Sequence, residues 1–201
     1  MNYLAHAYLS FGQDEVLVGN FIGDFVKGKM MNTFPRKVQN GIRLHREIDK
    51  YTDTHPLVRA GQSYLRPKFR LYSTVITDIY FDYFLAKNWD RYSDIPLEEF
   101  VQNTFETMKH YRQLFPDRFV NMFQWMVEEN WLLHYQEIEG IRKTLTGMSR
   151  RTRFESKMEI AHLNLMEKED EFQVIFLAFF KDLETFAQQK LLEIQQSNAG
   201  H

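Results

Sequence analysis

Apolar residues recur every three or four positions along nearly the whole chain, and this spacing constrains the fold more than any other feature. A period of 3.6 residues is typical of helices that bury one face, whereas half-buried strands alternate at every second residue. No segment alternates convincingly in that way, and the 44% hydrophobic content is ample for a core. The sequence therefore predicts an all-α protein, with a single globular domain of seven to nine helices over residues 1–201 and a frayed tail at 196–201. The expected helices are 2–10, 14–25, 35–56, 57–65, 72–89, 96–111, 117–131, 136–145 and 170–196, with a break at Pro67 after the fourth.

Acidic and imidazole side chains interrupt the apolar faces of these helices at helical spacing. His45 and Asp49 are four residues apart in GIRLHREIDKYTDTHP, and Asp78 and Asp82 are four apart in DIYFDYF. Residues at i and i+4 share one face of a helix, so each pair can reach the same ligand. An inward face of this kind needs a compensating group, because unpaired buried polar atoms cost free energy. The same residue types recur nearer the N-terminus, at His6 and Asp24.

A divalent cation is a natural compensating group, because it lets carboxylates cluster without repelling one another. It also activates water for attack on phosphorus. The chain has no cysteine, so an ion must be held by His, Asp or Glu, which favours Mn, Mg, Fe or Zn. The alternative for any single residue is a hydrogen-bonded core histidine or an aspartate paired with a nearby base. The expected metal ligands are Asp24, His45, Asp49, Asp78 and Asp82, and the expected catalytic residues are His6, Asp24, His45, Asp49 and Asp78.

The charge pattern excludes one class of function and leaves a binding surface open. A formal net charge of −2 excludes a globally basic nucleic-acid binder. Residues 142–157 nevertheless carry six basic side chains against one acid. This pattern suits phosphate or an acidic partner, but it equally suits a solvated loop after a helix C-terminus. The expected substrate-binding residues are Lys27, Arg46, Arg150, Arg151 and Arg153.

Other segments narrow the possibilities further. The apolar run 174–180 is far too short to span a bilayer, and MNYLAHAYLS lacks the basic region of a signal peptide. We therefore expect no membrane partner and a cytoplasmic location. A single Glu-x-x-His pair, at 159–162, is too little for a di-iron bundle, and no nucleotide-binding glycine loop is present. The Met and aromatic stripes of 100–131 and 172–186 are either ordinary core or the wall of a groove for an acyl or pantetheine arm.

Four segments resemble the acyl carrier protein phosphodiesterase family in order and spacing over roughly the first ninety residues: MNYLAHAYLS, GNFIGDFVKG, GIRLHREIDKYTDTHP and DIYFDYFLAKNW. The resemblance implies hydrolysis of the 4′-phosphopantetheine arm from holo-acyl carrier protein, an acidic protein partner. It also implies an HD-like helical phosphohydrolase fold with a divalent metal, Mn²⁺ ahead of Mg²⁺ or Fe²⁺. HD enzymes use adjacent His-Asp ligands, whereas here His45 is followed by Arg46. Related sequences often read Asp-His where this chain reads Asp82-Tyr83, which removes one potential ligand.

Two other functions remain open from the sequence. An HD-type phosphohydrolase acting on a nucleotide or another small phosphodiester would use the same polar residues. A non-enzymatic helical module that binds a carrier protein would instead hold its acids in salt bridges.

Overall fold

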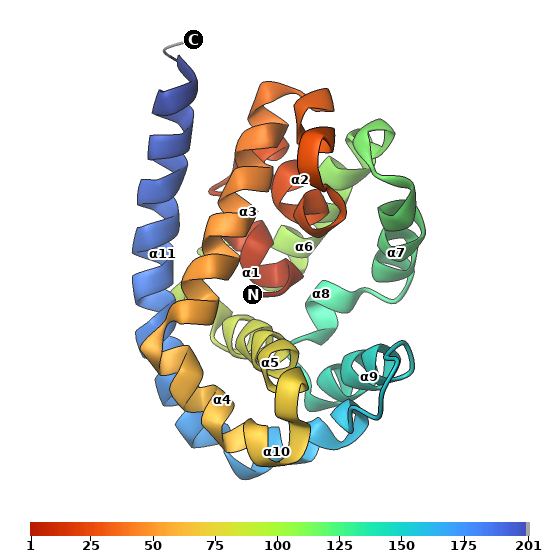
Figure 1. Ribbon diagram of the computed structural model, residues 1–201, viewed down its shortest axis with the longest axis vertical. Helices are drawn as coiled ribbons and strands as arrows, with labels where there is room; N and C mark the ends of the chain where they lie inside the picture. The colour runs from red at the N-terminus through yellow and green to blue at the C-terminus, as the bar shows by residue number, and fades with distance from the viewer. Residues whose placement is uncertain (200–201) are drawn as a thin grey trace.

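The computed structural model describes residues 1–199, which form eleven α-helices and six short 3-10 helices (Figure 1). No strand occurs in this part of the chain, so the all-α prediction is confirmed. None of its helices is long and apolar enough to cross a bilayer. The α-helices are α1 (Tyr3–Tyr8), α2 (Asp14–Ile22), α3 (Arg36–Thr54), α4 (Pro56–Phe69), α5 (Ser73–Lys87), α6 (Leu97–His110), α7 (Asp117–Glu128), α8 (Trp131–His134), α9 (Ile138–Ser149), α10 (Ala161–Glu167) and α11 (Glu169–Ala199). The 3-10 helices are η1 (Gly23–Phe25), η2 (Gly28–Thr33), η3 (Arg70–Tyr72), η4 (Trp89–Arg91), η5 (Arg112–Leu114) and η6 (Met158–Ile160).

Two short helices account for the excess over the seven to nine expected. α8 has four residues and α10 has seven, too few to display a clear apolar repeat. α4 also continues through Pro67, where we expected a break. Leu65 and Phe69 are buried on either side of that proline, and their packing outweighs the missing backbone hydrogen bond. α11 extends to Ala199, past the expected fraying point at 196, while 200–201 lie outside the described residues.

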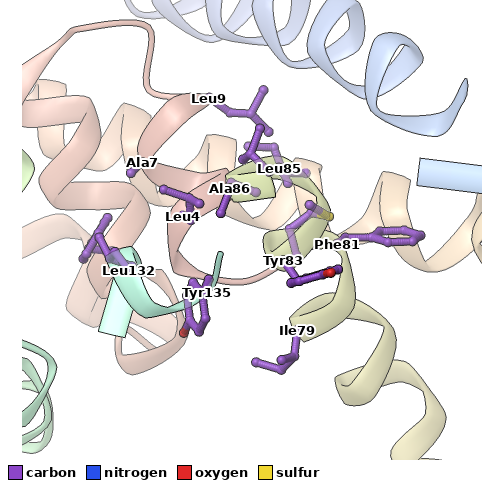
Figure 2. Close-up of a cluster of buried hydrophobic side chains, with 14 of the residues drawn as sticks. Leu4, Ala7, Leu9, Ile79, Phe81, Tyr83, Leu85, Ala86, Leu132 and Tyr135 are labelled. Carbon is purple, nitrogen blue, oxygen red and sulfur yellow. The ribbon is translucent and has the colours of Figure 1, made fainter. Parts of the chain in front are cut away.

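α5 is the central helix of the fold. From Ile76 to Ala86 every residue except Asp78 is buried, because α1, α4, α9 and α11 all pack against it. We expected a single inward stripe on this helix; instead residues 76–86 are covered on nearly every side, as their mostly apolar sequence allows. Side chains from α1, α5 and α8, among them Leu4, Leu85 and Leu132, meet in one apolar cluster (Figure 2).

α11 closes one side of the molecule, where it lies along α3 and α4 (Figure 1). Its phenylalanines stack on residues of the interior: Phe186 lies 4.1 Å from the Tyr51 ring of α3, and Phe179 lies 5.3 Å from the Phe81 ring of α5. Helices α7, α8 and α9 lie on the opposite side of the view (Figure 1). The helices α1, α2, α3 and α5, which carry the polar residues, are therefore enclosed between two apolar walls.

α2 and α3 contact each other through their backbones. A Cβ atom on Gly19 would lie 2.1 Å from the Val38 carbonyl oxygen, and one on Gly41 would lie 2.2 Å from the Val16 carbonyl oxygen. Only glycine lets the two helices approach this closely. Asn20 follows Gly19 on α2 and His45 follows Gly41 by one turn on α3, so this contact sets the spacing of the polar residues described below.

Gly41→Ala should lower the free energy of unfolding by about 2–3 kcal/mol, because the new methyl group meets backbone atoms that cannot yield. Gly147→Ala is the matched control: Gly147 lies in α9, and a Cβ there meets no atom within 4 Å. We expect the control to be neutral or to stabilise by up to about 1 kcal/mol, since alanine favours helix. Urea denaturation measures both. Equal effects of the two substitutions would contradict the backbone contact.

Candidate metal centre

Three side chains from α1 and α3 converge on one point. Asp49 bridges two imidazoles, with its Oδ1 3.2 Å from His6 Nε2 and its Oδ2 3.2 Å from His45 Nε2. One donor atom from each residue lies within 4.8 Å of the others. Both histidines are buried, whereas the Asp49 side chain is 35% exposed, so the group is open on one side. Two imidazole nitrogens and a carboxylate in this arrangement could hold a divalent metal ion.

Close packing fixes the two imidazole rings. They stack on each other with centroids 4.2 Å apart and an angle of 28° between their planes. The backbone of η1 covers the His45 ring at Gly23, where a Cβ would lie 2.4 Å from His45 Cγ. His45 Nδ1 is buried and has no hydrogen-bond partner among the described residues. The ring of His45 is thus held by packing against Gly23 and His6 and by the contacts of its Nε2 atom with Asp24 and Asp49.

Asn20 of α2 fixes the tautomer of His6. The Asn20 amide nitrogen donates to the His6 carbonyl oxygen at 2.9 Å and to Ser10 Oγ at 3.1 Å, which leaves its Oδ1 atom 2.9 Å from His6 Nδ1. An amide oxygen only accepts, so Nδ1 carries the proton and Nε2 carries a lone pair. Burial lowers the pKa of His6 to about 4, with His45 adding to the decrease and Asp49 opposing it. The neutral ring therefore presents a lone pair to a carboxylate oxygen, and a cation shared by the two relieves their repulsion.

Asp24 joins the group from η1. Its Oδ1 lies 3.2 Å from His45 Nε2, and its side chain is 70% exposed. The hydrogen bond with His45 holds the pKa of Asp24 below its usual range, so the carboxylate is ionised at neutral pH. Asp24 is therefore the most accessible acid of the group.

The amino group of Met1 lies among the acids. It is 3.1 Å from Asp78 Oδ1 and 3.4 Å from Asp49 Oδ1. Burial lowers the pKa of this amine, but Asp78 and Asp49 outweigh that effect and raise it to about 11. Burial raises the pKa of Asp78 to about 6, against the opposing ammonium. Burial would also raise the pKa of Asp49, but the opposing charge of the Met1 ammonium holds it well below its usual range. Asp78, an expected metal ligand, is thus paired with a cation of the chain itself.

Asp82, another expected ligand, lies outside this group. Its side chain is fully buried, and its two oxygens accept hydrogen bonds from the backbone N–H groups of Leu4 at 2.8 Å and Ala5 at 3.3 Å. These groups belong to the first turn of α1, which has no side-chain cap of its own. Burial raises the pKa of Asp82 to about 7, and the backbone hydrogen bonds oppose the rise. In this structure Asp82 caps α1 and thereby positions His6.

The basic residues expected at the site occupy different places. Arg46 donates to the Val26 carbonyl oxygen at 2.8 Å and so ties α3 to the segment after Asp24, while Lys27 is exposed in that segment. Arg150 and Arg151 are exposed beside a cavity that also reaches Asp24. Arg153 lies apart from it, with its guanidinium 5.6 Å from the Phe154 ring centroid.

Sequence reasoning missed two residues of the site. Asn20 lies next to Gly19 in an apolar helix, and an amide buried among apolar neighbours was a signal that could have been used. Tyr3 lines the same cavity as Asp24 and Arg151. Burial raises the pKa of its hydroxyl, Asp24 raises it further, and Arg151 lowers it. One tyrosine among ten gave no signal of this position.

Comparison with known proteins extends the resemblance beyond the first ninety residues. A model of the family described as acyl carrier protein phosphodiesterase matches residues 1–183. The acyl carrier protein phosphodiesterase of Klebsiella pneumoniae (strain 342) is 34% identical over 194 residues, which cover 96% of this chain and 100% of that relative. The proteins of the same name from Enterobacter sp. (strain 638) and Escherichia coli (strain K12 / DH10B) are 37% identical over 158 residues, or 78% of this chain and 82% of each relative. No solved structure matches, so the HD-like fold stays a prediction.

Asp82→Ala should remove the cap of α1. We expect the free energy of unfolding to fall by about 2 kcal/mol, because two buried N–H groups lose their acceptors. The amide protons of Leu4 and Ala5 should exchange with solvent faster, as measured by NMR. Asp53→Ala, at an exposed position of α3, should change stability by no more than about 0.5 kcal/mol. Unchanged exchange at Leu4 and Ala5 would contradict the capping role.

Proposed function

We propose a function for this chain on the basis of one fact: the chain belongs to the acyl carrier protein phosphodiesterase family. It hydrolyses the phosphodiester that joins 4′-phosphopantetheine to a serine of holo-acyl carrier protein and so releases apo-carrier and free 4′-phosphopantetheine. The observation that carries this proposal is the match over residues 1–183 together with the converging His6, His45 and Asp49 side chains. Water attacks phosphorus, the bond from phosphorus to the serine oxygen breaks, and that oxygen takes up a proton.

A divalent metal is part of the proposal, with Mn²⁺ as first choice and Mg²⁺ or Fe²⁺ as alternatives. His6, His45 and Asp49 would hold it, and Asp24 stands next to His45 as a further donor. The lone pair on His6 Nε2, 3.2 Å from an Asp49 oxygen, supports this assignment, because neither atom brings a proton to the contact. Asn20 supplies the hydrogen bond on the far ring nitrogen that metal-binding histidines commonly have. When bound, such an ion polarises the phosphoryl group and activates water.

The remaining residues act around that group. Asp24 is ionised and accessible, so it can orient the attacking water through a hydrogen bond. Tyr3 stays protonated because burial raises its pKa, so its hydroxyl can donate to a phosphoryl oxygen. Arg151 supplies positive charge at the same end of the cavity. Asp78 and Asp82 hold the N-terminal segment in place by pairing with Met1 and by capping α1.

The carrier protein would dock where the exposed arginines Arg150, Arg151 and Arg153 lie. These side chains belong to residues 142–157, the most basic stretch of the chain. An acidic partner is steered to such a surface, and its serine-linked arm would then enter beside Arg151. The cytoplasm is the location we propose, and the absence of cysteine is compatible with it.

Purified protein with added Mn²⁺ should convert holo-carrier to apo-carrier, seen by mass spectrometry as loss of the arm. His6→Ala and Asp49→Asn should each lower the rate at least about a hundredfold, because each removes a donor that holds the ion. Asp53→Asn should keep the rate of the unchanged protein. No apo-carrier under these conditions would defeat the substrate assignment, and cleavage of a small nucleotide phosphodiester instead would identify the other phosphohydrolase function.

The metal assignment has a test that does not depend on activity. Asn20→Leu should weaken Mn²⁺ binding about 10–100-fold, because the His6 ring loses the partner that fixes its tautomer. Asn121→Leu, at an exposed position of α7, should leave the affinity unchanged. Titration followed by the electron paramagnetic resonance signal of free Mn²⁺ measures both. A folded Asn20→Leu protein with unaltered affinity would remove Asn20 from the site.

A further inference from the structure

A cavity of about 1110 Å³ opens beside the metal centre, between α5 and the helices α7, α8 and α9. Asn2, Tyr3 and Asp24 line one end of it. Asp24 Oδ1 is also 3.2 Å from His45 Nε2, so Asp24 links the cavity to the His6–His45–Asp49 group, whose own side chains do not line it. A ligand in the cavity can therefore place one of its groups next to the metal centre.

Part of the cavity wall is apolar and is built by several elements. Val75 and Ile79 come from α5, and three methionines come from other helices: Met122, Met148 and Met158. Two contacts hold the wall together. Asn2 Nδ2 donates to the Tyr135 hydroxyl at 2.8 Å, and α9 lies against α8 so closely that a Cβ on Gly140 would be 1.9 Å from the His134 carbonyl oxygen. The rest of the lining is polar, so the cavity combines an apolar strip with many hydrogen-bonding groups.

Several cations line the cavity. Lys143, Arg150 and Arg151 are exposed there, and in the described part of the chain neither Lys143 nor Arg150 makes an ion pair. Glu128 and Glu129 line it too and keep their negative charges, because their hydrogen bonds come from the neutral Gln124 amide and Trp131 indole. The cavity therefore offers positive groups to a negatively charged ligand without being cationic as a whole.

The Tyr3 hydroxyl shows which end of the cavity suits that charge. This hydroxyl donates to Met122 Sδ at 3.7 Å, and Tyr3 lines the cavity together with Asp24 of the metal centre and with Arg151. A phosphoryl group at this corner would have Arg151 and the Tyr3 hydroxyl as donors. The apolar wall would extend away from it.

The ligand that fits is long and flexible, with both apolar and hydrogen-bonding groups along its length and a phosphate at one end. We propose that the cavity binds the pantetheine arm of the substrate, with its phosphate beside Tyr3, Asp24 and Arg151 and its dimethyl and amide segment along Val75, Ile79 and Met148. This inference rests on the proposed function. Sites for ligands of comparable size enclose about 300–1,000 Å³, so the arm fits with room to spare. Recognition of the phosphopantetheine arm, which keeps the phosphoryl group, is thereby assigned to α5 and α9, away from the metal ligands.

Free 4′-phosphopantetheine added to the Mn²⁺-loaded protein tests the assignment directly. Of the nine methionines, the methyl NMR signals of Met122, Met148 and Met158 should shift, whereas that of Met108, fully buried in α6, should not. Titration of the same ligand gives its affinity by calorimetry. Unshifted signals from the three cavity methionines at saturating ligand would overturn the proposal without bearing on whether the protein cleaves holo-carrier.

Filling the cavity tests it in the reaction. Thr144→Trp places a large ring in the cavity from α9, and Gly147→Trp does so where a Cβ meets nothing within 4 Å, so the second variant keeps the fold. Each should lower kcat/KM for holo-carrier and the affinity for 4′-phosphopantetheine at least about tenfold. Mn²⁺ affinity should be unchanged. Thr185→Trp, exposed on α11, is the control and should match the unchanged protein.

The outcomes separate the two proposals. If the unchanged protein cleaves holo-carrier and both cavity variants cleave it equally well, the cavity does not bind the arm. If the unchanged protein binds 4′-phosphopantetheine through the cavity but cleaves no holo-carrier, the proposed reaction fails and the binding site stands.

Discussion

The two hydrogen bonds from the first turn of α1 to the Asp82 carboxylate are the interaction on which the rest of the site depends. α1 is short and lacks a cap of its own, so it needs a partner to hold its free N–H groups. Asp82 supplies that partner from the middle of the central helix. The N-terminal segment is thereby fixed in the interior and brings Tyr3, His6 and the Met1 amino group to the acids of α3 and α5. Burying a carboxylate costs free energy, but here the carboxylate holds a short, uncapped helix in a fixed position in the site.

Polar and apolar tasks are divided along the chain. The first part contributes imidazoles, carboxylates and the amide of Asn20, all held by helices α1, α2 and α3. The later helices α7, α8 and α9 contribute much of the cavity lining, both apolar and polar. α5 serves both, because its Asp78 pairs with the Met1 amino group and its Asp82 caps α1, while Val75 and Ile79 line the cavity. In this arrangement the chemistry and the recognition of the arm can vary independently, because few residues take part in both.

The helical period was sufficient to predict the fold class and nine of the helices, and the four-residue spacing was sufficient to bring His45 and Asp49 together. It was not sufficient for α8 and α10, which are shorter than the repeat that identifies a helix. Asp82 shares the spacing of its neighbour Asp78, yet its partners are backbone groups 77 and 78 residues away, which no side-chain pattern encodes. The pairing of Asp78 with the α-amino group of Met1 could not be predicted from the sequence either, because every chain has such a group. Local spacing thus predicts which side chains share a face, whereas long-range contacts decide what that face meets.

The backbone contact between α2 and α3 has a mechanical consequence. Side chains between two helices can change rotamer and absorb a displacement, but at Gly19 and Gly41 there are none to do so. The two helices must therefore move as one body, and Asn20 travels with His45. Because Asn20 also holds the His6 ring by a hydrogen bond, the contact between two glycines bears on the relative placement of both imidazoles.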